Sequence, residues 1–424
     1  MTTTLLVFTI AYPYSGAPEA AFLDPEVEHL LRAFDRVCLV PAMRNGKRGE
    51  SAGGLEVLEG YAEAVAEDRS WAGRVVKTLA SSQVWADVAL APWLLVSPSG
   101  FRALGEVVRA SEKTRDWIVA FITREGLSPA STLLYTYWLG ASSLGAGLAK
   151  GLLPGIRLAS RAHGGDLYHE RHRTRRIPRQ ADALQKVDRL FTVSEHGRAY
   201  VAKRYPWAAG RCEVARLGVR DPGVLSKPSE DGVLRLASCS FAVPVKRLRL
   251  LSEGVVEFAR RNPGRHVEWF HMGGGPCLED VRVALASAPG NLVVDLPGQV
   301  AHADVHASYR AKPCDAFLNV SASEGVPVSV MEALSYGIPV VATAVGGTAE
   351  LLGHGGGKLL VPNPSAGEIA SALFGLTTDG GRLALRRASR QVWADLCRAD
   401  VNFSRFAGRL RSLLDSPGSA LAVP

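Results

Sequence analysis

The sequence lacks a hydrophobic run that could span a bilayer, an internal repeat and a low-complexity tract. Its most apolar internal stretch, from about Trp85 to Val96, contains Asp87 and Pro92, whereas a spanning helix needs about 20 apolar residues. The first residues, TTTLLVFTIAYPY, lack the charged start and small-residue cleavage site of a secretory signal. We therefore expect a cytoplasmic protein.

Cysteine is sparse, with six residues in a chain of 424, and no two of them form a C-x-x-C pair. No spacing of cysteine and histidine resembles a zinc site, and no Asp-x-Asp metal motif is present. Scattered thiols in a reducing compartment account for the cysteines. We expect no bound metal and no cofactor.

The formal net charge is +8 and the pI is about 9.3. Such a basic excess suits an acidic ligand, such as a nucleotide diphosphate or an anionic lipid surface, although solubility alone is an equally simple interpretation. Four arginines crowd the stretch from Arg171 to Arg176 without interleaved aromatic residues. We therefore do not expect binding to nucleic acid.

Short runs rich in Val, Leu and Phe alternate with longer amphipathic stretches along most of the chain. This alternation predicts parallel sheets covered by helices on both faces, which is an α/β fold. The predicted strands are Thr4–Ile10, Arg36–Val40, Thr132–Thr136, Arg157–Ala162, Arg189–Val193, Leu234–Ser238, Glu268–Met272, Leu292–Asp295, Ala316–Val320 and Pro339–Ala342. The segment GVRDPGVLSKPSEDG has a linker composition, so two domains are predicted, at 1–222 and 233–424.

The stretch from 319 to 352, NVSASEGVPVSVMEALSYGIPVVATAVGGTAELL, is typical of a strand, a tight loop and a helix, followed by the same again. Pro327 suits a first helical turn and Gly337 suits a helix end, so a helix is predicted from about Pro327 to Tyr336. A helix start at the carboxyl end of a strand binds anions through free amides. The amides expected to do so are those of Gly325, Val326, Val328 and Ser329.

Two glutamates, Glu324 and Glu332, lie on either side of this helix start. Eight residues of helix span roughly 12 Å, whereas paired hydrolase carboxylates lie about 5–9.5 Å apart. The two glutamates therefore suit two separate contacts with hydroxyl groups better than one acid–base pair. A structural alternative is open, in which either glutamate only caps a helix, because Ser321 and Ser329 each precede a glutamate at the spacing of a capping box.

These residues resemble the donor-binding signature of retaining GT-B glycosyltransferases of family 4. More narrowly, the chain resembles bacterial exopolysaccharide transferases of the colanic acid and amylovoran type. The other matching segments are YPYSGAPEAAFLDPEVEHL, SRAHGGDLYHER, DRLFTVSEHGRAYVAKRYP, SCSFAVPVKRL and EWFHMGGGP, in the expected order. The resemblance covers most of the chain outside about 45–125.

The resemblance implies two doubly wound, Rossmann-like domains that face a cleft. Residues 1–222 would bind the acceptor and residues 233–424 the nucleotide-sugar, with a terminal helix, about 382–414, crossing back to the first domain. It implies a glycosyltransferase that moves a hexose-type sugar from a UDP-linked donor to a lipid-linked glycan in bacterial exopolysaccharide or cell-surface polysaccharide synthesis. The transfer would retain the anomeric configuration, without a metal ion. Contact with the inner face of the plasma membrane is expected, with a solvated loop and a core helix as the open alternative.

The resemblance also implies roles for individual residues. Catalytic roles would fall to His163, Lys246 and Glu324. Donor binding would fall to Gly273, Gly274, Gly275, Lys246, Arg247, Glu324, Gly325, Val326, Val328, Ser329 and Glu332. On the acceptor side, Gly16 would line the first loop and Asp166 would orient the loop that carries His163.

The chain departs from the wider family at three positions. Ser240 stands where many members have an arginine, so Lys246, helped by Arg247, would neutralise more of the diphosphate. Pro327 stands where they have a glycine and offers no N–H. The first loop has only Gly16 in place of paired glycines. Three alternatives stay open: a transferase of the same fold acting on a small natural product, a nucleotide-sugar epimerase, and a non-catalytic binding protein.

Overall fold

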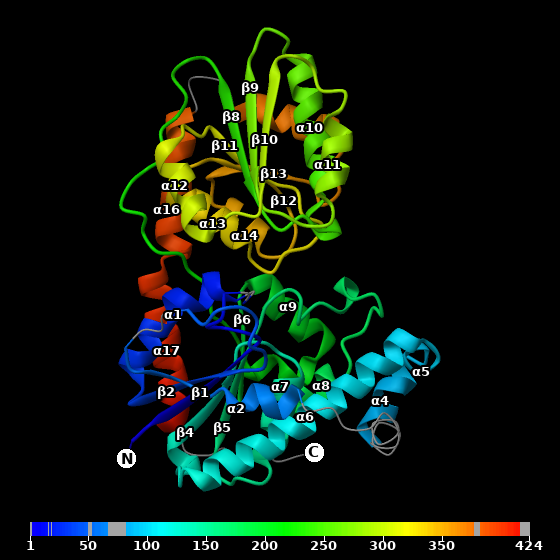
Figure 1. Ribbon diagram of the computed structural model, residues 1–424, viewed down its shortest axis with the longest axis vertical. Coiled ribbons are helices and arrows are strands. Elements are labelled where there is room, and N and C mark those ends of the chain that lie inside the picture. Colours follow the sequence, from blue (N-terminus) through cyan, green and yellow to red (C-terminus); the bar gives the residue numbers. More distant parts are fainter. Residues whose placement is uncertain are drawn as a thin grey trace. The chain divides into compact units, whose positions relative to one another are not determined.

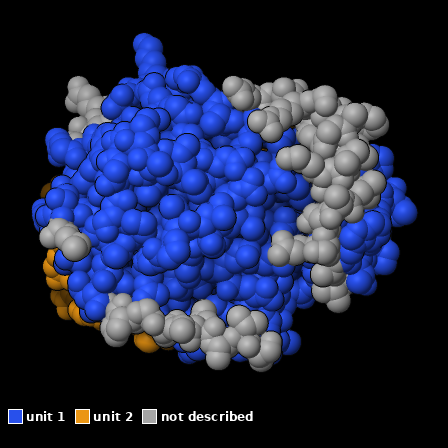
Figure 2. All heavy atoms as spheres, turned by 90° about the horizontal axis from the view of Figure 1, so that it is seen from below, with its two compact units in different colours: residues 1–215, 403–424 blue, residues 216–402 orange. Residues whose placement is uncertain are grey.

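The computed structural model describes residues 2–15, 17, 19–49, 53–66, 82–376 and 382–415. The chain forms two compact units (Figures 1 and 2). Unit 1 combines residues 1–215 with the segment from Phe403 to the end of the chain, and unit 2 comprises Arg216–Asn402. The first and the last described residues therefore belong to the same unit.

Unit 1 is built on a sheet of seven parallel strands in the order β3-β2-β1-β4-β5-β6-β7. The strands are β1 Thr4–Thr9, β2 Arg36–Pro41, β3 Leu55–Val57, β4 Thr132–Thr136, β5 Arg157–Ala162, β6 Arg189–Thr192 and β7 Cys212–Val214. Its α-helices are α1 Ala20–Ala33, α2 Gly60–Ala66, α4 Ser82–Leu90, α5 Trp93–Val96, α6 Pro98–Arg124, α7 Ala141–Lys150, α8 Gln180–Lys186, α9 Glu195–Arg204 and most of α17 Ala399–Asp415.

Strand β1 shows why its sequence is apolar throughout. Leu6 and Phe8 pack on one face with α6 and α7, whereas Leu5 and Val7 pack on the other face with α1 and α17. A strand with helices on both sides has no solvent face, and this is the expected arrangement in a parallel sheet.

Unit 2 repeats the design with six parallel strands in the order β10-β9-β8-β11-β12-β13. The strands are β8 Leu234–Cys239, β9 Val267–Met272, β10 Leu292–Gly298, β11 Ala316–Asn319, β12 Val340–Thr343 and β13 Gly357–Leu360. The α-helices are α10 Leu248–Arg261, α11 Leu278–Leu285, α12 His302–Ala311, α13 Val328–Ser335, α14 Thr348–Leu352, α15 Ala366–Leu376 and α16 Arg382–Leu396. Helices α10 and α11 cover one face, and α12, α13 and α16 lie on the other (Figure 1).

The two units divide between Ala215 and Arg216, close to the start of the segment of linker composition, Gly218–Gly232. Residues after Arg216 already pack in unit 2: Val219 donates its amide to the carbonyl of Cys397, and a Cβ on Gly218 would lie 2.7 Å from the amide nitrogen of Ala399. The Pro- and Gly-rich segment is likewise held, because the Ser229 amide donates to Asp315. The segment of linker composition, 218–232, is therefore part of unit 2 and is bonded to it.

The predicted terminal helix is two helices, α16 and α17, separated at Cys397 and Arg398. From Phe403 onward α17 packs in unit 1, where the Phe406 ring lies 5.5 Å from that of Tyr135 and 5.0 Å from that of Phe191. The expectation that the end of the chain returns to the first domain is confirmed. Within the described ranges, no helix is both long and apolar enough to cross a membrane.

Candidate functional site

The loop from β11 to α13 holds the two glutamates singled out in the sequence. Helix α13 begins at Val328, with Pro327 at its N-cap, close to the predicted start. Gly325 and Val326 lie in the loop, and Val328 and Ser329 open the helix. The first amides of a helix have no acceptor within it, so this is a place for an anion.

Glu324 is 6% exposed and forms an ion pair with Lys246, whose Nζ lies 2.6 Å from Glu324 Oε1. Asn319 Nδ2 donates to the same oxygen at 3.4 Å. Lys246 comes from the loop after β8, and that loop is tied to the loop after β11 because the Ala322 amide donates to the carbonyl of Val245. The fold thus brings together two residues that are 78 positions apart.

Glu332 is 4% exposed and faces two histidines of α12. Its Oε1 lies 2.5 Å from His302 Nε2 and 3.7 Å from His306 Nε2. Burial acts to raise the pKa of Glu332, but the contacts with His302 and His306 outweigh it, so the pKa lies below its usual value. The carboxylate is therefore held in its charged form.

The capping-box interpretation does not hold for either glutamate. The N-cap of α13 is Pro327, which makes no side-chain cap, and Glu332 lies in the body of the helix. Both carboxylates instead face cationic or ionisable partners on other elements. This arrangement leaves them available as acceptors for ligand hydroxyls.

Arg247 is turned toward the protein backbone. Its guanidinium donates to the carbonyls of Val320, Ser321 and Pro362, and its own φ of 49° is left-handed. These bonds tie the loop after β8 to the loop after β11. A donor-binding role for Arg247 stays a prediction, and the bonds observed here are those of a residue that positions Lys246 beside it.

The glycines after β9 serve a close approach between loops. Gly273 and Gly275 have φ of 143° and 141°, and a Cβ on Gly273 would lie 1.9 Å from the carbonyl oxygen of Ser240. The Ala242 amide donates to the carbonyl of Gly274 at 2.7 Å. The loops after β8 and β9 therefore pack backbone to backbone. Close approach of Gly273, Gly274 and Gly275 to a nucleotide stays a prediction.

Two features of this site were missed in the sequence. Gly346 has φ of 52°, and a Cβ there would lie 1.9 Å from the carbonyl oxygen of Glu324. The pair Gly346-Gly347, shortly after the predicted strand Pro339–Ala342, is a sequence pattern that indicates such a close backbone contact. No role for His302 and His306 was predicted from the sequence. They are four residues apart, the spacing that places two side chains on one face of a helix.

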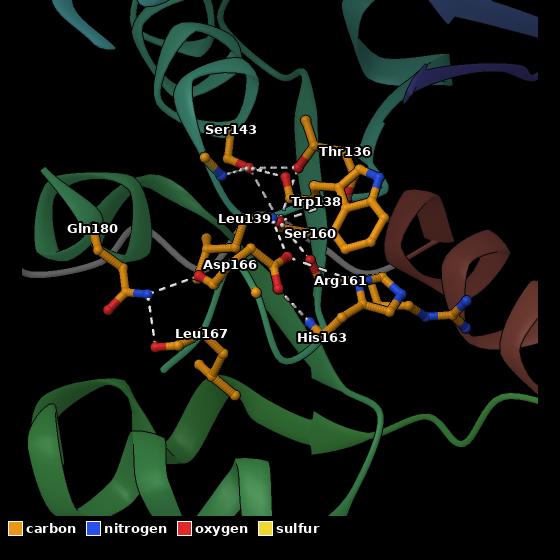
Figure 3. Close-up of polar contacts among 12 residues, drawn as sticks. Thr136, Trp138, Leu139, Ser143, Ser160, Arg161, His163, Asp166, Leu167 and Gln180 are labelled. Carbon is orange, nitrogen blue, oxygen red and sulfur yellow. Dashed lines mark hydrogen bonds and ion pairs between the residues drawn. The ribbon is translucent and has the colours of Figure 1, made fainter. Parts of the chain in front are cut away.

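In unit 1, His163 follows β5 and is 7% exposed (Figure 3). Its ring lies 4.4 Å from that of Trp138 and 4.9 Å from that of Tyr137. Neither ring nitrogen has a hydrogen-bond partner among the described residues. Nδ1 lies 3.7 Å from a carboxylate oxygen of Asp166, which is beyond hydrogen-bond distance. A buried imidazole whose nitrogens make no hydrogen bond is costly, which makes His163 a candidate for contact with a ligand.

Asp166 links two loops at the carboxyl ends of β4 and β5 (Figure 3). Its carboxylate accepts the amide of His163 at 2.7 Å and that of Leu139 at 2.9 Å. Gln180 donates to the carbonyls of Asp166 and Leu167, which holds the same loop from its other side. These are the contacts expected of a residue that orients a loop. Gly16 lies outside the described residues.

The basic stretch is only partly exposed. Arg176 is buried and donates to the Asp87 carboxylate through Nε at 3.1 Å, while Arg173 and Arg175 are exposed. The Trp93 indole donates to the carbonyl of Thr174 at 2.9 Å, so α5 and the basic stretch are adjacent. Asp87, noted in the sequence as an interruption of an apolar run, is thus the partner of a buried arginine.

Residues 234–379 match the family model Glyco_trans_1_4, described as glycosyl transferases group 1. This segment contains Lys246, Glu324 and Glu332 and lies within unit 2. The chain is 24% identical over 314 residues to the colanic acid biosynthesis glycosyltransferase WcaL of Escherichia coli K12, which covers 69% of this chain and 74% of WcaL. It is 36% identical over 118 residues to sucrose-phosphate synthase 5 of rice, 24% of this chain but only 12% of that protein.

Solved structures extend the likeness to the whole fold. Sucrose-phosphate synthase of Thermosynechococcus elongatus has a TM-score of 0.68 at 15% identity, covering 98% of this chain and 100% of that one. HepE of Anabaena, solved with UDP and glucose, has a TM-score of 0.63 at 15% identity, covering 97% and 100%. At such identity the structures show the fold alone, and the fold is GT-B. Fold and matched domain together indicate a glycosyltransferase of the GT-B type, related to bacterial polysaccharide glycosyltransferases.

Proposed function

We propose that the protein is a retaining, metal-independent glycosyltransferase of family 4, which uses a UDP-linked hexose as donor. The observation that carries this proposal is the Lys246–Glu324 ion pair beside the start of α13. A cation, a buried carboxylate and helix amides lie within one loop cluster. That set matches the groups of a nucleotide-sugar, which has a diphosphate to be neutralised and hydroxyls to be held.

Each residue has a separate part in the proposal. Lys246 leaves Glu324 in part to contact the diphosphate, and Glu324 then accepts hydrogen bonds from hydroxyls of the sugar. Glu332 accepts those of the ribose. HepE was solved with UDP and glucose, which supports a donor of this kind for a chain of the same fold.

The proposed chemistry is direct. The bond between the anomeric carbon and the diphosphate oxygen breaks while a bond to the acceptor hydroxyl forms on the same face. The departing phosphate oxygen takes the acceptor's proton. Lys246 and the amides at the start of α13 stabilise the growing negative charge, as fixed donors do in other enzymes. His163 would contact the transferred sugar, the role that the resemblance implies.

Thermal unfolding with UDP, followed by assays of sugar transfer and of UDP release, tests this proposal. Wild-type protein should be stabilised by UDP, and Lys246→Ala should lower the transfer rate by about 10²–10³, as when another fixed charge-stabilising donor is removed. Lys312→Ala is the matched control, since Lys312 is an exposed lysine of the same unit. Equal losses in both variants, or no response to UDP, would refute the assignment.

For the acceptor, we propose a lipid-linked glycan at an anionic membrane surface. The support is that Trp85, Trp93 and Val96 are exposed, and that Trp93 donates to the carbonyl of Thr174, next to the exposed Arg173. Vesicles containing anionic lipid should bind the protein, and Val96→Ser with Arg173→Ala should reduce binding more than Leu383→Ser with Arg282→Ala does. Leu383 and Arg282 are exposed residues of unit 2. Equal binding by the two double variants would contradict the membrane surface.

A further inference from the structure

The contacts of Glu332 point beyond donor binding. Nε2 of His302, Nε2 or Nδ1 of His306 and a carboxylate oxygen of Glu332 all lie within 4.8 Å of one another. Two imidazoles and one carboxylate are ligands that Zn²⁺ and similar divalent transition ions accept, with three protein ligands leaving a fourth position open. The two histidines are four residues apart on α12 and Glu332 comes from α13, so two packed helices supply the set.

We propose that His302, His306 and Glu332 bind a divalent transition-metal ion of the Zn²⁺ class, and that the bound ion opposes binding of the nucleotide donor. The metal site rests on this geometry alone. The opposition to the donor rests on the proposed function, in which Glu332 holds the ribose.

The Tyr336 hydroxyl is the hydrogen-bond partner of His306 Nδ1, so Nε2 is the nitrogen that faces Glu332. His306 Nδ1 lies 3.0 Å from the Tyr336 hydroxyl, which itself donates to the carbonyl of His306 at 3.4 Å. With Nδ1–H donating to the Tyr336 oxygen, the Nε2 lone pair would be free to bind an ion 3.7 Å from the carboxylate, in place of a proton shared with Glu332. Metal-bound histidines are commonly held in this way through their second nitrogen.

The distances require little rearrangement. Ligand atoms around a tetrahedral zinc ion lie roughly 3.3 Å apart, given bonds of about 2.0–2.1 Å. The pair from His306 to Glu332 is at 3.7 Å, and the pair from His302 to Glu332 is at 2.5 Å. His302 is exposed and begins α12, so its ring can withdraw by less than 1 Å, while Glu332 is buried and fixed.

A bound ion would act on the donor in two ways. It would occupy the carboxylate oxygen that both histidines now face, and it would withdraw charge from an acceptor that the ribose hydroxyls need. Transfer needs no ion in this scheme. The ion instead prevents Glu332 from accepting those hydroxyls, so the free concentration of such ions would set how much protein can bind donor.

Titration with Co²⁺ in visible absorption, confirmed by Zn²⁺ calorimetry, tests the metal site without any donor. One saturable ion per chain is expected, with bands of imidazole and carboxylate ligation. His302→Ala or His306→Ala should weaken binding at least tenfold, whereas His266→Ala, at an exposed histidine of the same unit, should not. Tyr336→Phe should weaken binding about 10–100-fold, the usual effect of losing the partner that orients a ligand. Binding that is absent, or unchanged in both histidine variants, would overturn the site.

The effect on the donor is measured separately, as the UDP-induced thermal shift with Zn²⁺ and with chelator. Zn²⁺ should reduce the shift in wild type and in His266→Ala, and the same reduction should need at least tenfold more Zn²⁺ in His302→Ala. If Zn²⁺ binds but leaves the UDP-induced shift unchanged, the metal site stands and the proposed effect of the ion on donor binding is refuted. Absence of any UDP shift in chelator would refute the proposed donor while leaving the metal site standing.

Discussion

Glu26 in unit 1 and Glu332 in unit 2 are both buried carboxylates, but their surroundings differ. Glu26 and its partner Arg161 are each 0% exposed, and Tyr135 donates to Glu26 at 3.2 Å. Glu332 instead faces His302, whose side chain is 54% exposed, and His306. One carboxylate is enclosed with a permanent cation, and the other has partners that solvent can reach.

The pKa shifts follow this difference. Burial raises the pKa of Glu26, and the Arg161 guanidinium opposes that rise. The histidine contacts, by contrast, more than offset the burial of Glu332 and bring its pKa below the usual value. Glu26, whose partner is buried, stabilises the fold. Glu332, whose partners are accessible to solvent, can exchange them for ligand hydroxyls or a metal ion.

The largest expected effect comes from replacing each carboxylate by its amide. Glu26→Gln would leave the Arg161 charge buried without an anion and should cost unit 1 about 3–5 kcal/mol. Glu332→Gln removes a contact with an exposed partner and should cost about 1 kcal/mol or less, while abolishing the UDP-induced shift. Denaturant unfolding followed by circular dichroism measures both. Similar costs in the two variants would show that both carboxylates are structural.

Low pH should affect the units differently as well. Burial lowers the pKa of His169 to about 3, where its Nδ1 accepts the Ile177 amide and its Nε2 faces the Tyr205 hydroxyl. The unfolded chain would protonate this histidine near pH 6.5, so unit 1 should lose up to about 1.4 kcal/mol of stability per pH unit as the pH falls from about 6.5 toward 3. Glu332, with its lowered pKa, keeps its charge over the upper part of this range.

Unfolding of wild type and of His169→Asn at several pH values between 7 and 5 checks this expectation. Asparagine retains an acceptor near the Ile177 amide but does not titrate, so the variant should be less stable at pH 7 and show a shallower pH slope. Parallel slopes in the two proteins would assign the pH dependence to other groups.

Much of the fold was predictable because every central strand is covered on both faces. Strands β4 and β5 match their predicted bounds, and the other predicted strands differ by a few residues at their ends. The short edge strands β3, β7 and β13 were not predicted, since they are three or four residues long and partly exposed. Periodicity over so few residues carries little signal.

The residues of the candidate site that are close in sequence could be predicted. The contacts between residues that are distant in sequence could not. Glu324 and Glu332 come from one segment, so their spacing could be read directly. The contact between Lys246 and Glu324 depends on β8 and β11 being neighbours in the sheet. The contact between His302 and Glu332 likewise depends on α12 packing beside α13, which no local pattern shows.

The last prediction concerns the backbone, because the two units position their loops in different ways. Asp166 holds the His163 loop of unit 1 through side-chain hydrogen bonds, whereas in unit 2 Gly346 lets one backbone segment approach Glu324 directly. Gly346→Ala should cost about 1–2 kcal/mol from its left-handed φ alone, and the added Cβ would press on the Glu324 carbonyl.

The matched control is Gly375→Ala, at an exposed position of α15 with no atom within 4 Å of the added Cβ, where alanine should be neutral or stabilising by up to about 1 kcal/mol. Unfolding measures the cost, and the UDP-induced shift measures the displacement of Glu324. Loss of both stability and UDP response in Gly346→Ala, beside an intact control, would show that close backbone contact positions this carboxylate. An unaffected UDP response would mean that the Lys246 ion pair alone is sufficient to place Glu324.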